Sequence, residues 1–145
     1  MDRKREREAG TMKQEKRAER NQDAYGLLKP CLERASALQT ALILFEWDNE
    51  TLAPREAGKY TAKVQGALSE AYQEIMTGKN IEKLLEQCRQ ETGLSEAERA
   101  IIREAQEEYD RLVCIPPKEY RDYKELVAES ARVWAEAKEQ QDFNA

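Results

Sequence analysis

Apolar residues recur every three or four positions along most of the chain after residue 23, and this spacing is typical of one helical face. The first run predicts a long helix that ends near Trp47. Because Pro30 lies early in the pattern, the helix either starts there or is kinked. The unbroken apolar run at residues 41–45 predicts burial on more than one side of this helix. The predicted inward residues of the first helix are Leu28, Leu32, Ala35, Leu38, Leu42 and Phe45.

Breaking and capping residues divide the rest of the chain into further helices. A polar connection over residues 48–53 leads to Pro54, which favours the start of a second helix. Gly78 is typical of the end of that helix, and a short third helix is predicted between Asn80 and Gly93. Its predicted inward residues are Ile81, Leu84, Leu85 and Cys88, whereas those of the second helix are Tyr60, Val64, Ala67, Leu68, Ala71 and Ile75.

Two more helices complete the pattern. Ser95 and Glu98 have the spacing of a capping box, which predicts the start of the fourth helix. Pro116-Pro117 ends that helix and begins the last one. The predicted inward residues are Ile101, Ile102, Ala105, Tyr109, Leu112 and Val113 in the fourth helix, and Tyr120, Tyr123, Val127, Ala131, Trp134 and Ala137 in the last. Exposed i,i+4 ion pairs are predicted at Glu107–Arg111, Arg121–Glu125 and Arg132–Glu136.

The composition supports an all-α fold. Charged residues make up 37% of the 145 positions, and only six Gly and four Pro are available for turns. Valine, isoleucine and threonine do not alternate with polar residues, so strands have no support. We therefore expect an antiparallel helical bundle of about four long helices and one short one over residues 21–145, preceded by a disordered charged arm at residues 1–20.

The charge pattern and the cysteines limit which partners and which cellular compartment are expected for the protein. Residues 1–20 carry eight basic against five acidic residues, whereas residues 21–145 carry sixteen against twenty-four, so the helical body is a poor binder of nucleic acid. No apolar run reaches the ~20 residues that a membrane span needs. Cys31, Cys88 and Cys114 are widely spaced and adjoin apolar stripes, which predicts buried, reduced thiols in a cytoplasmic protein.

The chain contains no histidine, and this excludes several kinds of catalytic site. Zinc sites of the H-E-x-x-H type, di-iron bundles and nucleophile–histidine pairs all require imidazole. The scattered glycines form no phosphate-binding loop. Three acidic residues, Glu46, Asp48 and Glu50, cluster beside Trp47. In a functional interpretation, burial beside the indole raises the pKa of one carboxyl group. In a structural interpretation, which is the more common case, acids at a helix end cap the helix or form ion pairs.

The order of several short motifs resembles the N-terminal segment of Taq-type (thermostable) metallocarboxypeptidases over roughly residues 24–145. The central motif is Trp47-Asp48-x-x-Thr51-x-x-Pro54, which follows a leucine-rich helix opening with Tyr25-Gly26-Leu27-Leu28. The remaining matches are Arg103 and Tyr109 running into Ile115-Pro116, and Trp134 and Ala137 followed by Asp142-Phe143.

The resemblance implies a larger all-helical, saddle-shaped peptidase that removes C-terminal residues from peptides and is usually a homodimer. It implies zinc, or another divalent metal such as cobalt, held by an H-E-x-x-H helix and a downstream Glu that lie beyond residue 145. No residue of this chain matches a catalytic, cofactor-binding or metal-binding position, so none is assigned. The chain is expected to form a wall or lid of the cleft, to be truncated before the zinc motif, and to be inactive alone.

Two matters stay open at this stage. Trp47 either plugs a helix junction while Asp48 and Thr51 cap backbone groups, or the segment lines the cleft and touches peptide substrate. The alternative function is a stand-alone helical module for protein interaction or oligomerisation. In either case we expect exposed apolar surface at Tyr123, Trp134 and residues 41–45, because a part of a larger domain exposes the face that its other part covers.

Overall fold

The computed structural model describes residues 24–141, which form five α-helices and one short 3-10 turn. The helices are α2 (Ala24–Thr51), α3 (Gly58–Met76), α4 (Lys79–Gln90), α5 (Glu96–Leu112) and α6 (Pro117–Gln140), and the turn η1 is Arg55–Ala57. The predicted all-α class, with four long helices and one short one, is confirmed. The arm predicted for residues 1–20 lies outside the described residues.

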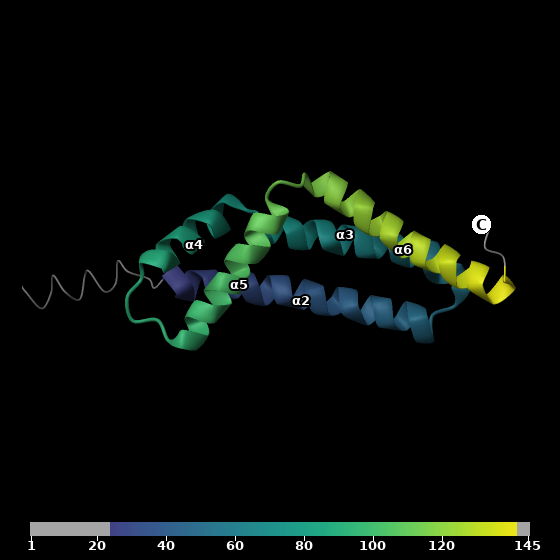
Figure 1. Ribbon diagram of the computed structural model, residues 1–145, viewed down its shortest axis with the longest axis horizontal. Helices are drawn as coiled ribbons and strands as arrows, with labels where there is room; N and C mark the ends of the chain where they lie inside the picture. Colours follow the sequence, from purple (N-terminus) through teal and green to yellow (C-terminus); the bar gives the residue numbers. More distant parts are fainter. Residues whose placement is uncertain (1–23, 142–145) are drawn as a thin grey trace, which may run out of the picture.

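The helices α2, α3 and α6 lie side by side and run in alternating directions, with α3 in contact with both others (Figure 1). The helices α4 and α5 pack over the N-terminal half of α2 (Figure 1). One apolar cluster joins α2, α4 and α5 through Tyr25, Leu28, Ile81, Leu85, Cys88, Ile102 and Ala105. A smaller cluster joins α2, α3 and α5 through Ala35, Tyr72, Met76 and Leu112.

The first helix includes the proline and extends past its predicted end near Trp47. It begins at Ala24 and includes Pro30, so the alternative in which it starts at the proline is wrong. It also continues to Thr51, through most of the predicted connection over residues 48–53. The reason is local hydrogen bonding: the Thr51 hydroxyl donates to the Trp47 carbonyl at 2.6 Å, and the amides of Leu52 and Ala53 donate to the Asp48 carbonyl. Within the described part of the chain, none of the helices is long and apolar enough to cross a membrane.

The starts of the later helices show where a local sequence signal is enough to predict a helix boundary. The α5 capping box is present, since Ser95 Oγ accepts from the Glu98 amide and the Glu98 carboxylate accepts from the Ser95 amide. The second helix begins at Gly58 instead of Pro54, because the Pro54 carbonyl accepts a hydrogen bond from the Ala57 amide and closes η1 first. Gly93 adopts φ +106°, a conformation that glycine tolerates, but α4 already ends at Gln90, before the predicted stop at this glycine.

The predicted inward face of the second helix is wrong. Tyr60 is 75% exposed and Ala67 is exposed, while the other predicted positions are only half-buried. The buried face is instead largely small or polar, and it consists of Thr61, Ala62, Gln65, Gly66, Ser69, Tyr72, Gln73 and Met76. The helix α3 lies between α2 and α6, and the face on which these neighbours approach most closely becomes buried. Small residues on that face allow the close approach.

The predicted inward face of the last helix is also wrong for the described chain. The helix α6 contributes no buried residue, and the predicted inward positions Tyr123, Val127, Ala131 and Trp134 are exposed. It contacts α3 through a polar face that includes Arg121, Glu125 and Arg132. The face predicted for the first helix is confirmed, because its six inward residues are buried or half-buried. Its run at residues 41–45 is not covered on more than one side, since Ile43 and Leu44 are exposed.

The cysteines form no disulfide within the described residues, and only one of them is fully buried. Cys88 lies in the α2–α4–α5 cluster, Cys31 is half-buried and Cys114 is exposed. The prediction of three buried thiols is therefore wrong for Cys114. That residue follows the last turn of α5, where its apolar neighbour Val113 is exposed as well.

Candidate functional site

Close packing between α3 and α6 depends on two glycines of α3. A Cβ atom at Gly66 would lie 3.3–3.4 Å from Glu125 and Arg121 of α6, and one at Gly58 would lie 2.5 Å from Arg132 Cδ. Arg121 also bonds to Glu70 of α3 at 3.1 Å and crosses the interface. Glycine thus allows the long polar side chains of α6 to lie against the α3 backbone.

Arg132 is the centre of an ion-pair network on α6. Its guanidinium donates to Glu129 at 2.6 Å and to Glu136 at 2.5 Å. Hydrogen bonding to Arg132 lowers the pKa of the Glu129 carboxyl. The predicted Arg132–Glu136 pair is confirmed. Of the other two predicted pairs, Arg121 bonds to Glu70 instead of Glu125, and Arg111 bonds to Glu108 instead of Glu107.

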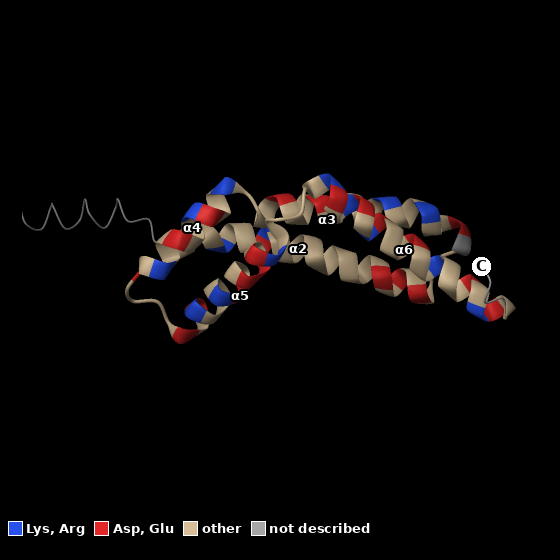
Figure 2. Cartoon of the chain, turned by 45° about the horizontal axis from the view of Figure 1, so that its top comes forward, with Lys and Arg blue, Asp and Glu red and all other residues tan. Residues whose placement is uncertain are grey.

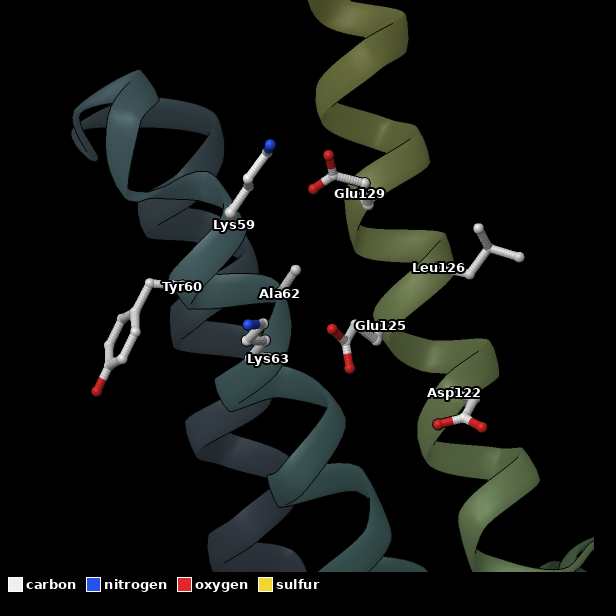
Figure 3. A pocket seen from close by; sticks show the side chains of 8 residues that line it. All are labelled: Lys59, Tyr60, Ala62, Lys63, Asp122, Glu125, Leu126 and Glu129. Carbon is white, nitrogen blue, oxygen red and sulfur yellow. The ribbon is translucent and has the colours of Figure 1, made fainter.

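A groove of about 640 Å³ lies between α3 and α6 beside this network (Figure 3). The side chains of Glu125 and Glu129 point toward α3 across it, whereas those of Tyr60 and Leu126 point away (Figure 3). The residues that line it are Lys59, Tyr60, Ala62, Lys63, Asp122, Glu125, Leu126 and Glu129. The opposed charges of the two walls largely compensate each other. The lining contains no serine, threonine, cysteine or histidine, so it offers no nucleophile paired with an imidazole base.

Metal chemistry has no suitable donor set in the part of the chain that the structure describes. No group of three or more His, Cys, Asp or Glu residues there could hold a metal ion, and the sequence supplies no imidazole. This applies to the acidic segment Glu46, Asp48 and Glu50 as well. A tetrahedral zinc site of histidines and carboxylates does not fit these residues.

The acidic segment lies at the exposed end of α2, where Figure 2 shows red residues beyond a long uncharged stretch. Trp47 is 57% exposed, so within this chain it does not plug the helix junction. Thr51 does satisfy a backbone carbonyl, as the structural interpretation predicted. The contribution of Asp48 seen here comes from its main-chain carbonyl. Contact of this segment with peptide substrate stays a prediction.

Two exposed apolar faces are the most unusual feature of the surface. The outer face of α6, defined here as Tyr123, Leu126, Val127, Val133 and Trp134, has exposures of 37–66%. The end of α2 exposes Ile43, Leu44 and Trp47 by 57–61%. The expected exposure of Tyr123, Trp134 and part of residues 41–45 is confirmed. Contiguous apolar surface on helices that already pack on one side marks a contact surface.

Sequence reasoning did not find the polar contacts inside the bundle. The buried Tyr72 hydroxyl donates to Glu108 at 3.0 Å, and burial followed by this hydrogen bond raises the pKa of Tyr72. The Gln73 amide donates to the carbonyls of Leu112 and Ile115. These contacts join residues 36–42 positions apart, and periodicity within one helix carries no signal for them.

Comparison with known proteins identifies the family. The profile of the carboxypeptidase Taq (M32) metallopeptidase family matches residues 27–145. The chain is 31% identical over 114 residues to Carboxypeptidase 1 of Bacillus subtilis (strain 168), an alignment that covers 78% of this chain and 23% of that protein. The chain therefore spans about a quarter of the length of this relative, and no solved structure gives a significant match. The chain belongs to the carboxypeptidase Taq (M32) metallopeptidase family.

Proposed function

We propose that this chain supplies the N-terminal helical wall of the substrate cleft in a zinc-dependent carboxypeptidase that releases C-terminal amino acids from peptides. The family match over residues 27–145 supports the ancestry. The chain has no histidine, so it cannot form the metal-binding motif expected of the family, which requires two imidazoles. Hydrolysis then depends on residues outside this sequence, and the chain alone is inactive.

The exposed apolar faces are the observation that carries this proposal. A stable single domain buries its large apolar side chains, whereas α6 has none buried and exposes two large aromatic residues, Tyr123 and Trp134. We infer that the rest of the peptidase fold covers the outer face of α6 and the end of α2. Trp47 then contacts that missing part or the peptide in the cleft. Cysteines that form no disulfide within the described residues are consistent with the cytoplasmic location that we propose for the protein.

An activity assay tests the proposal directly. The purified chain, supplied with zinc, is incubated with an N-blocked dipeptide that has a free carboxyl end, and full-length Carboxypeptidase 1 of Bacillus subtilis serves as the positive control. We expect amino-acid release by the control only. Zinc-dependent hydrolysis by this chain, abolished by a chelator, would contradict the proposal.

The alternative is a stand-alone interaction or oligomerisation module, and the same apolar faces favour it. Analytical ultracentrifugation over a wide concentration range tests this alternative. Concentration-dependent association, as in a homodimer, supports the module, because a second copy then covers the apolar surface. A monodisperse monomer at every concentration would count against the module.

A further inference from the structure

The outer face of α6 has two edges that differ in charge. One edge borders the groove of Figure 3 and carries Asp122, Glu129 and Glu136. These carboxylates are already paired, Asp122 with Lys118 at 2.5 Å and both glutamates with Arg132. A partner that approached this edge would therefore find little free charge to bind.

The opposite edge carries Lys124 and Lys138, which are fourteen positions apart and so lie on the same side of the helix. Each ammonium lies over an aromatic ring of α6, with Lys124 5.6 Å from the centre of Tyr120 and Lys138 5.1 Å from that of Trp134. Neither lysine forms an ion pair with another residue in the described range 24–141. Among the described residues, this edge therefore presents two positive charges without an ion-pair partner, beside exposed aromatic surface.

We propose that the outer face of α6 binds an amphipathic helix whose apolar seam is flanked by aspartate or glutamate on the side that meets Lys124 and Lys138. This rests on the proposed function, in which the rest of the peptidase fold covers α6, and it adds the chemistry of the covering element. The apolar face supplies the contact area, and the two lysines favour one orientation of the partner by charge complementarity.

The same edge charges disfavour a second copy of α6 as the partner. In an antiparallel two-fold pair of helices, each edge meets its own copy, which sets Lys124 and Lys138 against their equivalents. A parallel pair would set the lysines against carboxylates that Lys118 and Arg132 already neutralise. An anionic membrane surface is also disfavoured, because α6 as a whole carries six acidic and five basic residues.

Two synthetic helical peptides test the proposal on the whole chain. Both carry the same leucine seam, but one has glutamate and the other has lysine at both edges. The Trp47→Phe variant leaves Trp134 as the only fluorescent indole, because the chain has two tryptophans. We expect the acid-edged peptide to shift the Trp134 emission to shorter wavelength and to bind at least about tenfold more tightly than the base-edged one, a preference that salt weakens.

Charge reversal supplies the matched control. Lys124→Glu with Lys138→Glu should invert the preference, whereas Lys79→Glu with Lys83→Glu on α4 makes the same change in net charge and should leave it intact. Circular dichroism verifies that each variant is helical. Equal affinities for the two peptides, no binding of either, a preference unchanged by reversal at α6, or a dimer that already buries Trp134 would each overturn the proposal. None of these outcomes bears on whether the chain hydrolyses peptides, which the activity assay decides separately.

Discussion

Three polar residues of α3 face the interior of the bundle at intervals of four, and they are not equivalent. Gln65, Ser69 and Gln73 are each at most 5% exposed. Only Gln73 donates side-chain hydrogen bonds across the bundle, to the carbonyls of Leu112 and Ile115. The Oε1 atoms of Gln65 and Gln73 and the Ser69 Oγ atom accept none from the described residues, so the three residues differ in the donor groups and not in the acceptors. A buried polar atom without a partner is costly, whereas one that satisfies another buried group is not.

This difference predicts opposite effects of two identical substitutions. Gln73→Leu removes the donor to the Ile115 carbonyl and one of two donors to the Leu112 carbonyl, which keeps the Ile115 amide, and we expect it to lower the free energy of unfolding by ~2 kcal/mol. Gln65→Leu removes an unsatisfied acceptor from the same helix and should be neutral or stabilising. Urea denaturation of both variants measures the contrast. Equal losses would mean that the Gln73 bonds contribute nothing specific.

Tyr72 predicts how stability depends on alkaline pH. Burial and the hydrogen bond to Glu108 raise the pKa of its phenol above that of an unfolded tyrosine, about 10. Above that pH the unfolded state loses the proton that the folded state keeps, so stability falls as pH rises. Burial raises the pKa of Tyr109 and Tyr120 in the same direction, so Tyr72→Phe should reduce the slope without abolishing it.

The measurement is the free energy of unfolding between pH 9 and pH 12, values chosen to bracket the unfolded tyrosine pKa of about 10. The control is Tyr60→Phe, which removes the hydroxyl of a tyrosine that is 75% exposed and should leave the slope unchanged. Tyr72→Phe also loses about 1 kcal/mol at neutral pH, because the bond to Glu108 is gone. An unaltered slope in Tyr72→Phe would contradict the role of this phenol.

At the scale of the helices, a helix start with its own capping residues was more predictable than the buried faces of α3 and α6. Local chemistry sets a boundary, and the Ser95–Glu98 box opens α5 as the sequence predicts. A face depends on the neighbours: the apolar stripe at Tyr60 and Val64 marks the exposed or half-buried side of α3, because α2 and α6 pack on its small and polar residues. In the candidate site, the ion pair Arg132–Glu136 could be predicted from its i,i+4 spacing within one helix. The ion pair Arg121–Glu70 joins two helices, so spacing within one helix could not predict it.

The contact between Gly58 and Arg132 gives a prediction about helix packing. In Gly58→Ala the new methyl group meets Arg132 Cδ, so the side chain must leave its place between Glu129 and Glu136. We expect a loss of ~1–2 kcal/mol in stability. In an Arg132→Ala background the obstacle is absent, and Gly58→Ala should be neutral or should stabilise by up to ~1 kcal/mol. A double-mutant cycle measures the coupling, and additive effects would show that the contact does not constrain α6.

At the scale of the whole molecule, the packing is concentrated at one end. The larger apolar cluster joins α4 and α5 to the start of α2, and the smaller one lies where α3 and α5 cross α2. The other end consists of the exposed end of α2 and the C-terminal half of α6, with no buried residue in α6. The all-α class followed from composition and periodicity, whereas the exposure of Tyr123 and Trp134 on α6 was expected only from the resemblance to a part of a larger fold. Under the proposed function, the rest of the peptidase fold supplies the cover over α6.

Native-state hydrogen exchange should reveal this asymmetry as a gradient of protection. Amides near Leu28 and Leu85, which are at most 1% exposed, should exchange only in global unfolding. Amides of residues 130–140 should exchange at least about a hundredfold faster, which corresponds to ~2.7 kcal/mol of lower local stability. The acid-edged peptide should slow exchange in α6 and leave α4 unchanged, because it covers only the outer face of α6. Uniform protection of the chain without any peptide would show instead that α6 is already covered, and a second copy would then be the remaining candidate.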